Sequence, residues 1–317
     1  MNLGINNKLI VFISLTFSLI VGSKFYGFGR DYYHAYKYPN LDWGYWYDYM
    51  GYRVSTFTIF DVNFGVYIVS FLLSISCGVL LKKFFKLKGL NSVIFFILIY
   101  SMTLHTWPII MSTSNAMRQG IVMSIMFIAF SYLMEKKIFT AFFFIFISIF
   151  FHKSGIIFLI IYVNVLLLKL ISNRLKKNKY IINFYILYGI LISFFIYYLI
   201  LFSGFVDIVY SKIIEKDYRF HFVVISLIYV FIFSYKYKFL KNDTISLFLY
   251  LFSFAITSVL ILGLNWEYER FMMMMTLPYI FMFSIFLNKN SSYIYYFVSI
   301  GSLLVLTIFN GMYSSFQ

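Results

Sequence analysis

The sequence predicts an all-α, polytopic integral membrane protein with about eleven transmembrane helices. Two compositional observations support this class. Of the 317 residues, 62% are hydrophobic and only 12% are charged, whereas soluble domains are about 45–50% apolar and about 25% charged. The third observation is that apolar runs recur from residue 10 to residue 309, with no intervening polar stretch long enough for a separate globular domain. We therefore expect a single polytopic membrane domain over residues 1–317.

The same composition excludes several other classes of protein. A soluble enzyme could not cover so much apolar surface. The single cysteine, Cys77, lies inside an apolar run, which excludes a disulfide framework within the chain and a cysteine-based zinc site. The chain contains no Asp-x-Asp pair and no glycine-rich phosphate loop. We therefore expect neither a bound metal ion nor another cofactor.

The candidate spans follow from cutting the chain at its charged clusters, because a membrane-spanning helix needs about 20 mostly apolar residues. We expect the first span to be an uncleaved helix, since only Lys8 precedes its apolar stretch and further spans follow. The eleven candidates are residues 8–22, 64–81, 90–104, 119–134, 138–151, 155–168, 181–205, 222–234, 245–264, 271–287 and 293–309.

The distribution of charge predicts a cytoplasmic N-terminus. With that orientation, 16 of the 26 Lys and Arg residues fall in inner loops, accompanied there by only two acids, Glu135 and Asp243. This excess of basic residues inside is typical of membrane proteins. The net charge of +15 is therefore explained by topology, and we expect no nucleic-acid partner.

The residue types that suit chemistry gather on the opposite, outer side. Five of the six arginines, nine of the eleven acids and all four histidines fall there in this topology. The planar guanidinium of arginine suits phosphate recognition, and histidine titrates near neutral pH. Any chemistry is therefore expected on the outer face. The histidines are His34, His105, His152 and His221.

The sharpest local pattern joins Asn115–Gln119, at the start of the fourth predicted helix, to Phe151–Gly155, at the end of the fifth. Arg118 lies 17 residues before Glu135, and His152 lies 15 residues after Lys137. At 1.5 Å per residue these lengths are about 25 and 22 Å, so both side chains reach a similar depth below the outer surface. Charged groups at that depth commonly line a functional cavity. The alternative is that Arg118 extends to the interface and His152 only caps a helix.

This pattern resembles the central signature of the Wzy-type O-antigen and polysaccharide polymerases of the EpsG-like family. The matching features are Asn-x-x-Arg-Gln opening a helix, a Lys-Lys turn, an aromatic helix and Phe-His-Lys-Ser. An acidic, tyrosine-rich first outer loop, here Asp31–Tyr36, and a late outer arginine, Arg270, extend the likeness. The chain departs from the family at residues 58–64, where Asp61 stands near the position at which many relatives carry Glu-Pro. It also lacks the arginine-x15-glycine loops of some other O-antigen polymerases.

The resemblance implies a GT-C-like membrane glycosyltransferase at the outer leaflet of the bacterial inner membrane, with its active site facing the periplasm or exterior. Such an enzyme joins undecaprenyl-pyrophosphate-linked oligosaccharide repeat units, as in the O-antigen of lipopolysaccharide. It implies the lipid bilayer and these lipid-linked sugars as partners, together with a chain-length regulator and a flippase. The open alternatives are a flippase or transporter of the same lipid-linked oligosaccharide, a glycan ligase and a membrane acyltransferase.

The same resemblance implies roles for individual residues. Arg118 and His152 are the expected catalytic pair, with His152 as the general base or as the group that orients the acceptor hydroxyl. Arg118 and Arg270 are expected to bind pyrophosphate. Two outer loops are expected to contact substrate. For the aromatic loop, residues 23–63, an aromatic belt at the membrane interface is an equally good interpretation. For the later loop, residues 206–221, a solvated connector is an equally good interpretation. The expected sugar-binding residues are Asp31, Tyr32, Tyr36, Trp43, Trp46 and Glu267.

Overall fold

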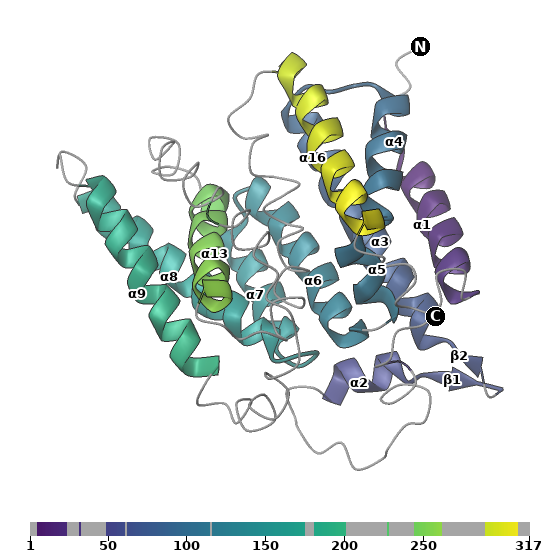
Figure 1. Ribbon diagram of the computed structural model, residues 1–317, viewed down its shortest axis with the longest axis horizontal. Helices are drawn as coiled ribbons and strands as arrows, with labels where there is room; N and C mark the ends of the chain where they lie inside the picture. The colour runs from purple at the N-terminus through teal and green to yellow at the C-terminus, as the bar shows by residue number, and fades with distance from the viewer. Residues whose placement is uncertain are drawn as a thin grey trace. The chain divides into compact units, whose positions relative to one another are not determined.

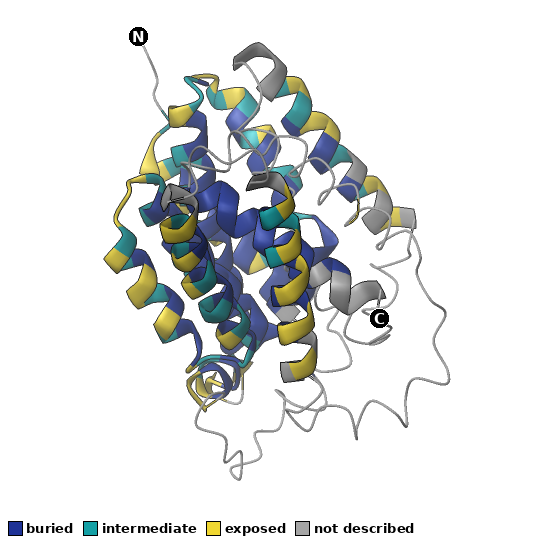
Figure 2. Ribbon diagram, turned by 90° about the vertical axis from the view of Figure 1, so that its left-hand side faces the viewer, coloured by how far each residue is buried: buried dark blue, intermediate teal, exposed yellow. Residues whose placement is uncertain are grey.

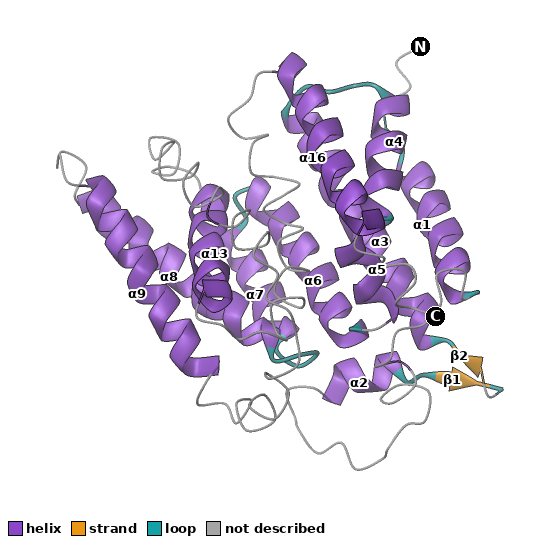
Figure 3. Cartoon of the chain, in the orientation of Figure 1, coloured by secondary structure: helices purple, strands orange, loops and turns teal. Residues whose placement is uncertain are grey.

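The computed structural model describes residues 5–23, 32, 49–60, 62–114, 116–174, 181–200, 227, 244–261 and 289–309. These residues are mostly helical (Figures 1 and 3), and the predicted all-α membrane class is confirmed at this level. The chain divides into two compact units, Met1–Ile156 with Leu287–Gln317, and Ile157–Phe286. Each unit is described by itself.

The first unit is organised around one long central helix. Helix α3 packs against α1 and against α6, α6 also packs against α7, and α16 packs against α4 (Figure 1). The helices of this unit are α1 (Asn7–Gly22), α2 (Tyr49–Ser55), α3 (Gly65–Leu87), α4 (Val93–Leu104), α5 (Trp107–Ser114), α6 (Met117–Met134), α7 (Ile138–Ser148) and α16 (Lys289–Phe309).

Many buried hydroxyl groups in this unit hydrogen-bond to the helices themselves. The Tyr100 hydroxyl donates to the Ser74 carbonyl oxygen at 2.6 Å and lies 2.9 Å from the Ser14 hydroxyl. Gly78 makes room for this ring, because an added Cβ would lie 2.7 Å from Tyr100 Cζ. These hydrogen bonds join α1, α3 and α4, and such internal pairing of polar groups is what a hydrocarbon environment requires.

The predicted span 90–104 is followed by a second, angled helix. Helices α4 and α5 are bent by 60° at His105 and Thr106. Their 20 residues would measure about 30 Å in a straight helix at 1.5 Å per residue, and the bend shortens this reach, so the pair is either a broken span or a re-entrant segment. Pro108 lies in the first turn of α5, where a missing N–H costs nothing. The sequence prediction ended this span at Leu104 and did not foresee α5.

The first outer loop contains local structure that the hydropathy pattern did not predict. Helix α2 is followed by an antiparallel pair of two-residue strands, β1 (Thr58–Ile59) and β2 (Val62–Asn63). Phe60 lies in the turn between them with a φ of 49°. The Asn63 side chain accepts a 2.7 Å hydrogen bond from the Gly65 N–H at the start of α3.

The second unit is built on helices α9 (Ile181–Ile200) and α13 (Thr244–Ile261), which pack together; α8 (Ser154–Arg174) begins in the first unit and continues into the second. Phe158 stacks on Phe252 at 5.4 Å between ring centroids. The Lys169 ammonium donates to the Thr244 hydroxyl at 2.9 Å. Many helices show one buried and one exposed face (Figure 2), and large apolar side chains on the exposed faces suit contact with lipid.

Nine of the eleven predicted spans coincide with helices among the described residues; the range 271–287 and, apart from Leu227, the range 222–234 lie outside them. Within the described part of the chain, three helices are long and apolar enough to cross a membrane, or four if the bent α4–α5 pair is one span. Five shorter apolar helices accompany them. The total of eleven remains a prediction.

Helix ends differ from the predicted ones for a physical reason. Helix α3 continues to Leu87 and α8 to Arg174, beyond the predicted limits of Leu81 and Leu168. Lysine and arginine favour helices nearly as well as leucine does. A charged cluster therefore marks where the bilayer ends and need not mark where the helix ends.

Candidate functional site

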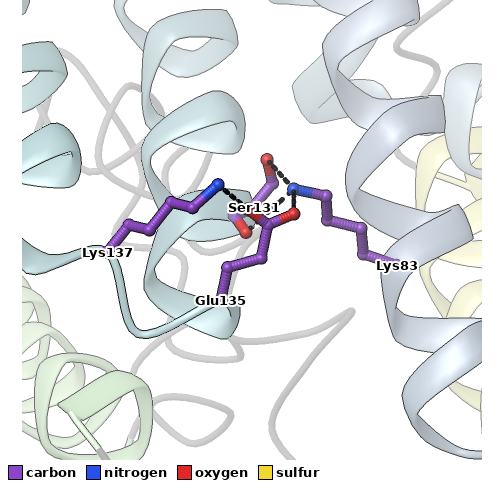
Figure 4. A network of polar contacts seen from close by, with 4 residues as sticks. All are labelled: Lys83, Ser131, Glu135 and Lys137. Carbon is purple, nitrogen blue, oxygen red and sulfur yellow. Dashed lines mark hydrogen bonds and ion pairs between the residues drawn. The ribbon is translucent and has the colours of Figure 1, made fainter.

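The helix pair that carries the site is an antiparallel hairpin formed by α6 and α7, as the sequence predicted. Its turn, Glu135–Lys137, is tied to α3 by the Glu135 carboxylate, which lies 2.5 Å from Lys83 Nζ and 2.9 Å from Lys137 Nζ (Figure 4). Lys83 also donates to the Ser131 carbonyl oxygen at 3.1 Å. This network holds one end of the hairpin against α3.

The charge network is stable over the ordinary pH range. Hydrogen bonds from Lys83 and then Lys137 lower the pKa of Glu135 from 4.5 to about 2. The pKa of Lys137 is raised, chiefly by its hydrogen bond with Glu135. Because the folded-state pKa of Glu135 is depressed, the stabilisation is complete at neutral pH and is lost as the pH falls from about 4.5 towards 2.

Arg118 lies in the first turn of α6, at the opposite end of the hairpin from Glu135. Its side chain is half-buried, and its Nε atom is shielded from solvent. The neighbouring Gln119 is buried. Gly120 allows α6 to approach α5, because a Cβ there would collide with the Ser112 carbonyl oxygen. Arg118 is thus held on a rigid helix start rather than on a loop.

His152 lies beyond the end of α7, in the turn that leads to α8. Helix α7 ends at Ser148, whereas the sequence predicted an end at Phe151. Hydrogen bonds of the 3₁₀ type, between residues i and i+3, continue the turn as far as Phe151. Gly155 closes this turn tightly, since an added Cβ would lie 2.6 Å from Ser148 Oγ. His152 is buried, with 8% of its surface exposed.

One hydrogen bond of His152 favours one tautomer of its ring. Its Nδ1 atom accepts a 3.1 Å hydrogen bond from the Ser154 backbone N–H and lies 2.9 Å from the Ser154 hydroxyl. A backbone N–H can only donate, so Nδ1 carries no proton in this arrangement. In the neutral imidazole the proton is then on Nε2, which makes Nε2 a hydrogen-bond donor. His152 also caps the start of α8.

Helix α2 packs against this end of the hairpin. It contacts both α3 and α6. Gly51 lies directly against the Phe151 carbonyl oxygen, next to His152, and a Cβ at Gly51 would collide with that oxygen. Tyr52 is buried, while Arg53 is exposed and donates from Nε to the Tyr49 hydroxyl at 3.1 Å. A segment of the first outer loop therefore joins the same end of the first unit.

The sequence of this chain matches a known family over nearly its whole length. A sequence model of the EpsG family matches residues 7–317. The chain belongs to the EpsG family. No curated protein and no solved structure matches the chain. The match confirms the resemblance noted in the sequence, and family membership associates the chain with polysaccharide-polymerase-like membrane proteins of glycosyltransferase type.

Most other expected site residues of this EpsG-family chain lie outside the described residues. They are Asp31, Tyr36, Trp43, Trp46, Glu267 and Arg270. Tyr32 is described and buried, with 6% of its surface exposed. The departure residue Asp61 and the outer loop 206–221 also lie outside the described part. Within the described residues, no three His, Cys, Asp or Glu side chains gather into a candidate metal site.

Sequence reasoning missed two contributors to the site. Ser154, the partner of His152, is part of the Phe-His-Lys-Ser pattern. The pattern includes the residue but does not indicate its hydrogen bonds with His152. Gly51 stands among the tyrosines of the first outer loop. Nothing in the sequence joins it to Phe151, one hundred residues later.

Proposed function

We propose that this EpsG-family chain is a polysaccharide polymerase of the O-antigen type. It joins undecaprenyl-pyrophosphate-linked oligosaccharide repeat units by transferring the growing chain from its lipid pyrophosphate to a sugar hydroxyl of the next unit. The observation that carries the proposal is the location of Arg118 and His152 at the same end of one helix hairpin, in a chain that matches the family from residue 7 to residue 317.

The proposed active site faces the periplasm or exterior. The turn of the hairpin and the adjoining end of α3 carry a cluster of lysines, among them Lys83 and Lys137. The excess of basic residues on cytoplasmic loops assigns that end to the cytoplasm. Arg118 and His152 lie at the other end, which fits substrates presented by the outer leaflet of the bacterial inner membrane.

Arginine is the proposed ligand of pyrophosphate in both substrates. Arg118 holds the leaving pyrophosphate of the donor, and Arg270 binds that of the acceptor lipid. Two anionic lipids in one cavity repel each other, and two separate guanidinium groups offset this repulsion. Each guanidinium offers a bidentate, charge-assisted contact, and that of Arg118 strengthens as the donor's leaving pyrophosphate gains charge. The proposed sugar contacts are Asp31, Tyr32, Tyr36, Trp43, Trp46 and Glu267.

His152 is proposed to orient the acceptor through its Nε2–H group, and a carboxylate, Asp31 or Glu267, is then the proposed acceptor of the hydroxyl proton. The bond from the Ser154 N–H to Nδ1 supports this role over that of a general base, because the neutral ring then has no lone pair available on Nε2. A base role would require the ring proton to move to Nδ1, which would remove the acceptor of the Ser154 N–H. Such a loss costs about 1–3 kcal/mol for a buried donor.

A flippase is the second candidate, and the bent α4–α5 pair favours it. Transporters commonly form their substrate sites where a spanning helix is interrupted. The two candidates differ in the product that accumulates when the protein is missing. A polymerase leaves translocated, single-repeat lipid-linked units, whereas a flippase leaves no translocated unit.

The deciding experiment is glycan profiling of a deletion strain, with the wild-type gene restored as the control. We expect single-repeat units on the outer face and loss of long chains, both reversed by the restored gene. Loss of all translocated units would contradict the proposal and favour the flippase. Normal long chains in the deletion strain would exclude both functions.

A further inference from the structure

A cavity lies at the lysine-rich end of the first unit, away from Arg118 and His152. It has a volume of about 840 Å³ and lies where α1, α3 and the end of α6 meet. Polar side chains line part of it, and apolar side chains line the rest. The polar residues of its lining are Asn7, Lys82, Lys83, Lys86 and Glu135.

The charges around the cavity do not cancel. Among the residues that the structure describes, its lining contains three lysines and one carboxylate, Glu135. That carboxylate is held between Lys83 and Lys137, at 2.5 and 2.9 Å (Figure 4). Lys82 donates to a neutral partner, the Asn7 side-chain oxygen, at 2.8 Å. Lys82 and the exposed Lys86 therefore give the cavity an excess of positive charge.

The apolar lining of the cavity lies on the same face of α3 as Lys82 and Lys86, on the side towards the middle of the membrane. Ile75, Val79, Lys82 and Lys86 follow one another at spacings of four, three and four residues, which places them in one stripe along the helix. Val11 of α1 forms part of the opposite wall and is 37% exposed. The site is thus cationic at the membrane surface and apolar below it.

We propose that this cavity binds an anionic phospholipid of the inner leaflet, independently of the proposed function. The lipid phosphate lies between the ammonium groups of Lys82 and Lys86, and an acyl chain lies along Ile75 and Val79. Basic pockets between transmembrane helices on the cytoplasmic side recognise anionic headgroups in this way. The general excess of lysine on this side explains the charges, but it does not require a cavity with an apolar wall beneath them.

The charge contribution is tested by lipid binding to the purified full-length protein in detergent, measured by native mass spectrometry. We expect phosphatidylglycerol to bind and phosphatidylcholine to bind at least tenfold more weakly. The double variant Lys82→Gln, Lys86→Gln should bind phosphatidylglycerol at least tenfold more weakly than the wild type. The matched control is Lys136→Asn, Lys169→Gln, which removes the same charge from described residues outside the cavity lining and should bind like the wild type.

Asparagine is chosen at position 136 because Lys136 has a φ of 60°, which asparagine tolerates. Equal losses in the two double variants would overturn the proposal, because they would show only a general attraction between charges. Unchanged binding by the Lys82→Gln, Lys86→Gln variant would overturn it as well.

The apolar wall is tested separately with Val79→Trp, which fills the groove and leaves all the lysines in place. We expect this variant to lose phosphatidylglycerol binding by at least tenfold while keeping its elution volume on gel filtration. Inorganic phosphate and glycerol 1-phosphate, at millimolar concentration, should not displace the lipid. Lipid binding that survives in Val79→Trp, or effective competition by either soluble phosphate, would contradict a lipid site.

Discussion

At the scale of single residues, one hydrogen bond changes how the candidate chemistry is understood. The sequence supports two roles for His152, because imidazole is the side chain whose unperturbed pKa of about 6.5 allows proton transfer at neutral pH. The contact between Ser154 N–H and Nδ1 directs the ring proton to Nε2. This arrangement favours orientation of a substrate by a donor over abstraction of its proton.

The His152→Gln variant separates these two roles. Glutamine retains an N–H donor and an oxygen acceptor but cannot take a proton, so we expect polymerisation within about tenfold of the wild type. His152→Ala removes the donor and should lose about 10²-fold or more, a typical cost for one donor at a reacting centre. The measurement is the ratio of long chains to single-repeat units in cells.

The matched control is His105→Gln, which replaces another outer histidine, one whose Nδ1 lies 2.7 Å from the Ser101 carbonyl oxygen. It should polymerise normally. Protein abundance in the membrane must be equal in all variants, because His152→Ala also removes a helix cap. If His152→Gln were as inactive as His152→Ala, the result would favour the general-base role for His152.

At the scale of elements, the arrangement depends on a few close backbone contacts. Helix α2 reaches the end of α7 only because Gly51 has no side chain, and α6 approaches α5 only because Gly120 has none. In both cases the opposing group is a backbone carbonyl, which cannot rotate away as a side-chain tip can. The elements near Arg118 and His152 are therefore held with little freedom.

Gly51→Ala tests this packing. The added methyl group meets the Phe151 carbonyl oxygen, so α2 must move away from the turn that carries His152. Overpacking of this kind typically costs about 1–3 kcal/mol. We expect a lower melting temperature and at least a tenfold loss of polymerisation.

Gly301→Ala is the control, because an added Cβ in that helix would lie 3.8 Å from Met102 Cε, an ordinary contact distance. It should leave both the melting temperature and polymerisation at or above the wild-type values, since alanine favours helix over glycine. Normal melting and activity in Gly51→Ala would mean that α2 does not need this contact.

At the scale of the whole molecule, charge distinguishes the two ends of the α6–α7 hairpin. The lysine network around Glu135 lies at one end of the hairpin, and Arg118 and His152 lie at the other. The inferred lipid site and the proposed active site are thus assigned to opposite leaflets. Both assignments depend on a cytoplasmic N-terminus.

Cysteine-accessibility labelling tests that orientation. Single cysteines introduced at Lys176 and Asp217 should react with an impermeant reagent from opposite sides, with Lys176 protected in intact cells. The native Cys77 is buried, so its background labelling should be low, and the parent chain is the control. Reaction of both introduced cysteines from outside would show that the predicted topology is wrong.

Several features were predictable because they depend on local composition. Hydropathy reflects the free energy of transferring each segment into hydrocarbon, which depends on local composition. Nine of the eleven spans predicted from it therefore coincide with helices within the described residues. The Lys-Lys turn and the spacing around it correctly predicted the α6–α7 hairpin. The pattern between Asn115 and Gly155 also indicated the EpsG family, which the match over residues 7–317 confirms.

Other features depend on residues that are distant in the sequence. The contact of Gly51 with Phe151, the break between α4 and α5, and the cavity below Lys82 and Lys86 arise from how helices pack. Apolar helices in lipid have little hydrophobic preference for one neighbour over another, so close packing and internal hydrogen bonds select the partners. The membrane class and the predicted orientation therefore depend on the chain's local chemistry, whereas the surroundings of His152 and the cavity below Lys82 and Lys86 exist only in the folded arrangement.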